Sequence, residues 1–189
     1  MKKHLKLFTA FLATGLLSAP TFAANRYVSA LGGISWINNI NRAVGPKMTT
    51  DSGATVLGAI GCDYDGYRVE TEAGYQTNNV DSSVTVLSLM ENGYYDFKVA
   101  GITPYLMAGA GVAQVHFDNV YSYTPAGRIS DNETTLAFQA GAGVAIPVAR
   151  QVKLDARFRY FSTSDFSSQL TANTHIASNN ALLGLRVNF

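Results

Sequence analysis

The segment 152–160, VKLDARFRY, alternates apolar and charged residues without a break. Val, Leu, Ala, Phe and Tyr occupy one set of alternate positions, and Lys, Asp, Arg and Arg occupy the other. Successive side chains of a β-strand point to opposite faces, so this segment predicts a strand with one apolar and one ionic face. The same period of two recurs at 67–75, 136–146 and 181–189, which predicts an all-β chain.

The predicted strands are long, with about ten residues each where strands of soluble proteins average about five or six. Roughly ten tilted residues are what a strand needs to cross a bilayer. Charged residues make up only 14% of the chain, against roughly 25% in soluble domains. A soluble β-sandwich also alternates, but the strand length and the clustered charges favour a membrane strand. Such strands must close into a barrel, because hydrocarbon offers no partner for a free sheet edge.

Eight segments carry the pattern, at 26–36, 54–64, 67–77, 84–97, 104–117, 134–147, 152–161 and 179–189. Three of the connections are short, and one of them contains Asp65-Gly66, a strong hairpin-turn signal. The other connections, at 37–53, 78–83, 118–133 and 162–178, are longer and polar. The sequence therefore predicts an eight-stranded antiparallel up-and-down transmembrane β-barrel, with long loops extracellular and both chain ends periplasmic.

The first 23 residues have the pattern of a secretory signal peptide. Three lysines precede the apolar run 7–17, and Thr21 and Ala23 fit the small positions before a cleavage site. An amphipathic anchor helix is the alternative. Cleavage after Ala23 leaves residues 24–189 as a single barrel domain with eleven basic and thirteen acidic residues, a balance that argues against a nucleic-acid partner. The only cysteine, Cys62, cannot pair within the chain, and we expect a buried or lipid-facing thiol.

The charged positions of the alternating strands are expected to face the inside of the barrel. An Arg or Lys on the lipid face would cost about 2–4 kcal/mol near the midplane. The predicted interior set is Arg68, Glu70, Glu72, Asp96, Lys153, Asp155, Arg157, Arg159 and Arg186. An ion-conducting lumen is one interpretation. A plug of neutralised charges is favoured, because an eight-stranded barrel is narrow and opposite charges meet between neighbouring strands.

The facing of two strands stays open. In the fifth segment, either Tyr105 and Met107 point outward with Gln114 inside, or Leu106 and Ala108 point outward and a bulge precedes His116. The first segment is equally ambiguous.

Glu91 is an anomaly of a different kind, because the period of two sends it to the lipid near mid-depth. A bulge that turns it inward, a covering partner barrel or protonation would each resolve this, and we expect the bulge.

The end of the chain, GLRVNF, resembles the C-terminal insertion signal of bacterial outer-membrane barrels, with Leu183, Leu185, Val187 and Phe189 at its apolar positions. The stretches LMENGYYDF (89–97) and ITPYLMAGAGVA (102–113) resemble the small barrels of the opacity-protein and surface-antigen family, whose architecture is that of OmpX, Ail and the OmpA transmembrane domain. The resemblance implies an outer-membrane surface protein, often an antigen and sometimes an adhesin. It also implies contact with outer-membrane lipid and lipopolysaccharide, and with the barrel-assembly machinery through the last strand.

We therefore expect a non-catalytic surface barrel that binds a host or extracellular ligand through loops 37–53, 118–133 and 162–178. Exposed aromatics would contribute, namely Tyr121, Tyr123, Phe166 and Trp36, although Trp36 and Tyr123 also fit an interfacial aromatic girdle. The alternative is a narrow porin-like channel for small solutes.

A lipid A-modifying hydrolase is a remote alternative. THIASNN places His175 near Ser178 and Asn179 and faintly resembles the His-x-Ser-Asn motif of the outer-membrane lipid A deacylase. The spacing is one residue too long, and no acidic residue follows Asn180 to orient the histidine. His116 is expected to be a polar residue near the rim. No metal or cofactor is expected, because the sequence contains no zinc-ligand spacing and no phosphate-binding loop.

Overall fold

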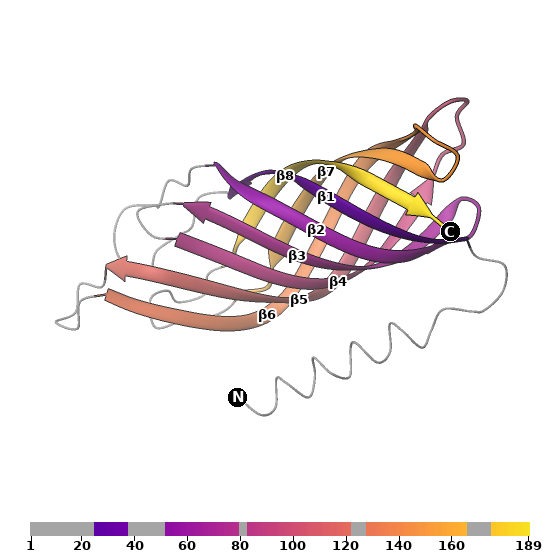
Figure 1. Ribbon diagram of the computed structural model, residues 1–189. Coiled ribbons are helices and arrows are strands. Elements are labelled where there is room, and N and C mark those ends of the chain that lie inside the picture. The colour runs from indigo at the N-terminus through magenta and orange to yellow at the C-terminus, as the bar shows by residue number, and fades with distance from the viewer. Residues whose placement is uncertain (1–24, 38–51, 80–82, 122–127, 166–174) are drawn as a thin grey trace.

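A computed structural model describes residues 25–37, 52–79, 83–121, 128–165 and 175–189. These form eight strands: β1 (Asn25–Ile37), β2 (Ser52–Asp63), β3 (Tyr67–Asn79), β4 (Ser83–Asp96), β5 (Thr103–Tyr121), β6 (Arg128–Pro147), β7 (Val152–Thr163) and β8 (Ala177–Asn188). Each strand pairs antiparallel with its neighbours in sequence, and β1 pairs with β8, so the sheet closes on itself (Figure 1). The predicted closed eight-stranded barrel is confirmed. The described residues contain no helix long and apolar enough to cross a membrane.

The two ends of the barrel differ. At one end, called here the turn end, short connections join β2 to β3, β4 to β5 and β6 to β7, and Asn25 and Phe189 lie at the same end. The tightest connection has Asp65 and Gly66 at φ 60° and 126°, the left-handed conformations that a primed two-residue hairpin turn requires. The signal peptide assigned to residues 1–23 lies outside the described residues. The opposite end is called here the loop end.

Strands β5 and β6 are longer than predicted. β5 ends at Tyr121 and β6 starts at Arg128, so most of the predicted loop 118–133 belongs to a hairpin. The register of this hairpin has one irregularity, between Phe117 and Val120. The alternation used to find strands is imposed by the bilayer, and it is absent from the part of a hairpin that extends beyond the barrel wall. This explains why the sequence pattern predicted a loop.

The burial pattern settles the facing of the two ambiguous strands. In β5, Tyr105 and Met107 are buried, whereas Leu106 is 53% exposed. The first alternative for the fifth segment is therefore wrong. The second has the correct facing, but its bulge is absent: pairing with β4 runs unbroken through Gln114 and His116, so Gln114 lies on the outer face. In β1, Tyr27, Ser29, Leu31, Ser35 and Ile37 face inward.

Candidate functional site

The lumen holds eight of the nine charged residues predicted to face it, and each of the eight is at most 8% exposed. They are Arg68, Glu70, Glu72, Asp96, Asp155, Arg157, Arg159 and Arg186. The ninth, Lys153, lies on the same face of β7 but is only half-buried, at the turn end. The eight charges comprise four cations and four anions, so the set is electrically neutral.

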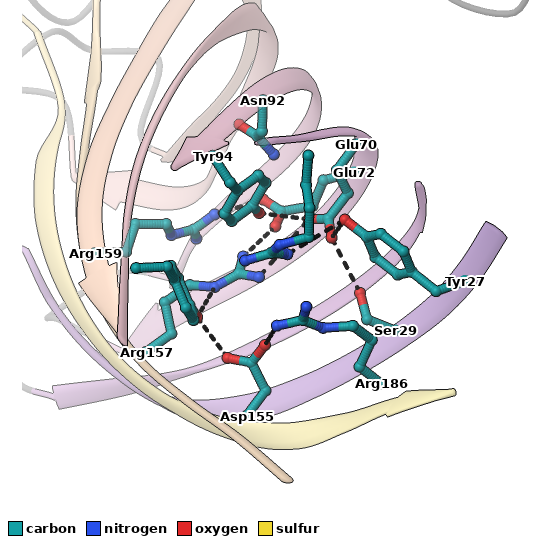
Figure 2. Close-up of polar contacts among 12 residues, drawn as sticks. Tyr27, Ser29, Glu70, Glu72, Asn92, Tyr94, Asp155, Arg157, Arg159 and Arg186 are labelled. Atoms are coloured by element: carbon teal, nitrogen blue, oxygen red, sulfur yellow. Dashed lines mark hydrogen bonds and ion pairs between the residues drawn. The ribbon is translucent and has the colours of Figure 1, made fainter. Parts of the chain in front are cut away.

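Glu72 on β3 is the centre of this network, which is called here the lumen charge network (Figure 2). Its Oε2 lies 2.7 Å from Nη1 of Arg157, and its Oε1 lies 3.1 Å from Nη1 of Arg159. Gln139 donates a further bond of 3.1 Å to Oε1 and accepts one of 2.9 Å from Arg159. One carboxylate therefore joins β3 to β6 and β7 across the barrel.

Glu70, two residues earlier on β3, is held by hydroxyl groups. Tyr94 donates to Oε1 at 2.5 Å and Tyr27 donates to Oε2 at 3.0 Å, with Ser29 at 3.4 Å (Figure 2). Arg157 Nη2 lies 3.7 Å from the same carboxylate. The buried Glu70 carboxylate is therefore satisfied mainly by hydroxyl groups from β1 and β4, which link these two strands to β3.

Two further ion pairs lie toward the turn end. Arg68 binds Asp96 through two parallel contacts of 2.8 and 3.0 Å, and its guanidinium stacks 4.0 Å from the centroid of the Tyr94 ring. Arg186 lies 2.8 Å from Asp155, which also accepts a short bond from the Tyr105 hydroxyl. These pairs connect β3 with β4 and β7 with β8, the neighbouring strands between which the sequence predicted pairing.

Sequence reasoning missed the uncharged members of the network. They are Tyr27, Ser29, Asn92, Tyr94, Tyr105 and Gln139. Asn92 and Tyr94 share their face of β4 with Asp96, so alternation alone could have found them. Tyr27 and Tyr105 lie on the two strands whose facing the sequence left open.

The loop half of the lumen is filled differently. One side has a chain of neutral hydrogen bonds, in which Thr55 donates to Asn180 at 2.8 Å, Asn180 to Ser178 at 3.2 Å and Ser178 to Gln76 at 3.2 Å. The other side has an apolar cluster of buried residues: Ile37, Val84, Val86, Met90, Ala113, Val115, Ala137, Phe161 and Ile176. The loop half of the interior is thus divided between neutral polar groups and apolar groups, whereas the charged groups lie toward the turn end.

Glu91 lies on the outer face of β4. Its register partners, Thr71 on β3 and Ala110 on β5, belong to unbroken ladders, so the expected bulge is absent and that expectation is wrong. The side chain is half-buried in the wall, and its Oε1 accepts a bond of 2.8 Å from the Thr71 hydroxyl. The alternation of inward and outward residues therefore continues without a break through Glu91.

The residues that suggested a hydrolase do not assemble into one. His175 is exposed, with Nδ1 3.3 Å from Asp165, an acidic partner that sequence reasoning did not identify because it precedes the motif. Ser178 is fully buried and its hydroxyl donates to Gln76 inside the barrel, so it does not serve as a nucleophile activated by His175. His116 is half-buried on the outer parity of β5. Within the described part of the chain, no group of three or more His, Cys, Asp or Glu residues could hold a metal ion.

Of the four aromatic residues proposed for the loops, two lie within the described part of the chain. Trp36 lies on β1 with its side chain 39% exposed on the outer face, as in an aromatic girdle. Tyr121 ends β5, and Tyr123 and Phe166 lie outside the described residues. Cys62 is half-buried on the outer parity of β2.

Comparisons with known proteins agree with this geometry. The family described as the outer membrane protein beta-barrel domain matches residues 9–189. The outer membrane protein PagN of Salmonella typhimurium is 30% identical over 128 residues, which are 59% of this chain and 53% of PagN, so the match spans about half the length of that relative. The crystal structure of Neisserial surface protein A superposes with a TM-score of 0.66 at 20% identity, covering 87% of this chain and 97% of that one.

A crystal structure of the Yersinia pestis attachment invasion locus protein Ail, in complex with the heparin analogue sucrose octasulfate, has a TM-score of 0.52 at 13% identity over 88% of this chain and 100% of that one. At these identities both structural likenesses establish the fold. The apolar outer face, the ionic lumen and the family match together show that this chain belongs to the outer membrane protein β-barrel family and is a bacterial outer-membrane barrel.

Proposed function

We propose that the protein is a non-catalytic surface barrel that presents its loop end outside the cell and binds an extracellular partner there, with both chain ends in the periplasm. The N-terminal 23 residues are proposed to be removed as a signal peptide. Short turns on the periplasmic side and longer connections outside are the usual arrangement of outer-membrane barrels.

The observation that carries this proposal is the length of the β5–β6 hairpin. β7 ends at Thr163, which pairs with Ala137, and Ser164 still donates to the carbonyl of Leu136. The residues of β6 from Arg128 to Thr135 therefore extend past β7, a length of roughly 25 Å along the strand. Figure 1 shows the hairpin projecting at the loop end. On its other side the hairpin is accompanied by β4 up to the pair of Ser83 with Asp118, so residues 119–121 and 128–130 lie beyond both neighbouring strands. A paired ribbon held out on a barrel is suited to present a binding surface.

The charge of the connections at the loop end limits the kind of partner. Segments 38–51, 80–82, 118–133 and 162–178 together contain three basic and six acidic residues. The Ail structure holds a heparin analogue, which is a polyanion. A loop end with an excess of acidic residues favours a neutral or basic partner over a sulfated polysaccharide.

The contents of the lumen argue against the competing channel function. The lumen charge network and the apolar cluster occupy the interior over both halves of the barrel. An eight-stranded barrel has an interior just wide enough for its own side chains. We infer that the barrel does not conduct ions.

The proposal is tested by shortening the hairpin. Replacing residues 119–130 with an Asn-Gly turn removes the projecting ribbon and leaves the barrel wall intact. Host-cell adhesion of bacteria expressing this variant should fall to the level of bacteria without the protein, and added heparin should not inhibit adhesion by the wild type. Lys98→Ala, at the exposed turn end that this proposal places in the periplasm, is the control and should leave adhesion unchanged. Unchanged adhesion after hairpin removal, with a heat-shifted band that shows a folded barrel, would contradict the proposal.

A further inference from the structure

We propose that the face of the barrel around Glu91 is a contact surface for a second copy of this chain, in which the two Glu91 carboxyl groups hydrogen-bond to each other within the membrane. The inference concerns the lipid-facing wall and goes beyond the binding function of the loop end. If the protein proved to be monomeric, the proposed binding function of the loop end would still stand.

The first step is the position of Glu91. An aromatic band lies near the turn end of the same wall, where Tyr67 and Tyr95 pack edge to face at 5.1 Å and Tyr95 and Phe97 at 4.9 Å. Glu91 is four residues from Tyr95 along β4, which is roughly 10 Å of depth for a tilted strand. The apolar band of such barrels is about 25 Å tall, so Glu91 lies well inside the hydrocarbon.

The second step is its isolation. The eight charged residues that the strands bury in the lumen are all in ion pairs, whereas Glu91 faces outward with one hydrogen bond, from Thr71. A carboxyl group in hydrocarbon is costly unless its polar atoms are satisfied. The second oxygen of Glu91 is the group that a partner in the membrane would satisfy.

The third step is the shape of the surrounding wall. The outward residues next to Glu91 include five small ones: Thr71 and Ala73 on β3, Gly93 on β4, and Ala108 and Ala110 on β5. Larger side chains, Val69 and Leu89, border this patch on β3 and β4. A Cβ placed on Gly93 would meet no atom closer than 4.0 Å, so the surface is open there. Small residues let membrane-spanning elements approach closely.

The fourth step identifies the occupant. Two copies inserted in the same orientation are related by a two-fold axis along the membrane normal. Each residue therefore lies at the same depth as the equivalent residue of the other copy. Glu91 therefore meets Glu91. A neutral carboxyl group both donates and accepts, so two of them satisfy each other in a cyclic pair without any further side chain.

Cysteine cross-linking in native outer membranes tests the contact. In a Cys62→Ser background, Ala110→Cys lies beside Glu91. The control, Ile34→Cys, lies on the outer face of β1, where Ile34 is 50% exposed, three strands away from β4. Oxidation should cross-link the Ala110→Cys variant much faster than the Ile34→Cys control. Equal rates for the two variants would overturn the proposal.

Substitutions of Glu91 test the chemistry in reconstituted bilayers, by energy transfer between labelled copies at several protein-to-lipid ratios. Glu91→Ala should raise the dissociation constant of the dimer roughly 5- to 30-fold, as expected for the loss of one hydrogen-bonded pair in a membrane. Glu91→Gln should retain the affinity, because two amides form the same cyclic pair. An unchanged dissociation constant for Glu91→Ala, or a loss with Glu91→Gln equal to that with Glu91→Ala, would overturn it. The heat shift on gels verifies folding of each variant.

Discussion

Arg157 Nη1 on β7 lies 2.7 Å from Glu72 Oε2 on β3, although these strands stand on opposite walls of the barrel. The pair therefore spans the lumen, with the Arg157 guanidinium and the Glu72 carboxylate both completely buried. A contact of this kind ties the two walls together across the interior.

Removing the Glu72 carboxylate should destabilise the barrel strongly. Glu72→Ala leaves Arg157 and Arg159 buried with less compensation, and breaking a buried pair on one side costs about 3–5 kcal/mol. Urea unfolding in lipid vesicles, followed by the heat shift on gels, measures this. Lys98→Ala is the control, because its ion pair with Asp65 is highly exposed and its loss should leave unfolding unchanged. A Glu72 variant as stable as the wild type would show that the network does not stabilise the fold.

Replacing Arg68 with lysine should destabilise the protein although the charge is kept. Lysine cannot reproduce the two parallel contacts to Asp96 or the stacking on the Tyr94 ring. Hydrogen bonds to charged groups contribute about 1.5–3 kcal/mol, so a loss of that order in unfolding free energy is expected. Equal stability of the lysine variant would mean that charge alone matters at this position.

Substitution by alanine should destabilise the barrel at one of two adjacent glycines of β1 and have no effect at the other. A Cβ at Gly33 would lie 2.0 Å from the Ala181 carbonyl oxygen of β8, whereas one at Gly32 would meet its nearest atom at 3.9 Å. Gly33→Ala should therefore disturb the β1–β8 seam that closes the barrel, at a cost of about 1–3 kcal/mol. Gly32→Ala should fold as well as the wild type. Refolding yield in detergent compares them, and equal yields would contradict the described seam.

The last residue should matter more for assembly in the cell than for stability. Phe189 is 70% exposed, and its N–H donates to the Arg26 carbonyl at 2.9 Å, so few contacts hold it in the folded barrel. Its resemblance to an insertion signal predicts that deleting it lowers the amount of barrel in the outer membrane while refolding of the purified chain proceeds normally. Defects of similar size in both assays would assign Phe189 a structural role instead.

The alternation in β3, β7 and β8 was enough to predict the barrel and the burial of its charges. In β7 each face is chemically uniform, so the sequence VKLDARFRY allows only one orientation in a membrane. In β5 the stretch LMAGAGVAQ has apolar or small residues on both faces, and the period of two is then silent about facing. Tyr105 shows the same limit, since its ring suits a lipid interface and its hydroxyl suits the Asp155 carboxylate.

The pairing inside the lumen could be predicted only between neighbouring strands. Lys153 lies on the same face of β7 as Asp155, but at the rim of the barrel. Alternation predicts the face on which a residue lies and not its depth, so the sequence could not separate the two. Contacts such as Glu72 with Arg157 depend on the curvature of the closed sheet, which no local pattern encodes. At Glu91 the alternation correctly predicted an outward side chain, and the bulge expected to turn this residue inward is absent.

The orientation of the barrel wall is tested most directly at β7, whose apolar face should contact lipid. Spin labels at Phe158, which is 55% exposed, and at Arg157, which is 3% exposed, compare neighbouring positions on opposite faces of that strand. In lipid vesicles the label at 158 should collide readily with oxygen dissolved in the bilayer, and the label at 157 should not. Equal oxygen accessibility at the two positions, or greater accessibility at 157, would show that the ionic face of β7 does not line the lumen.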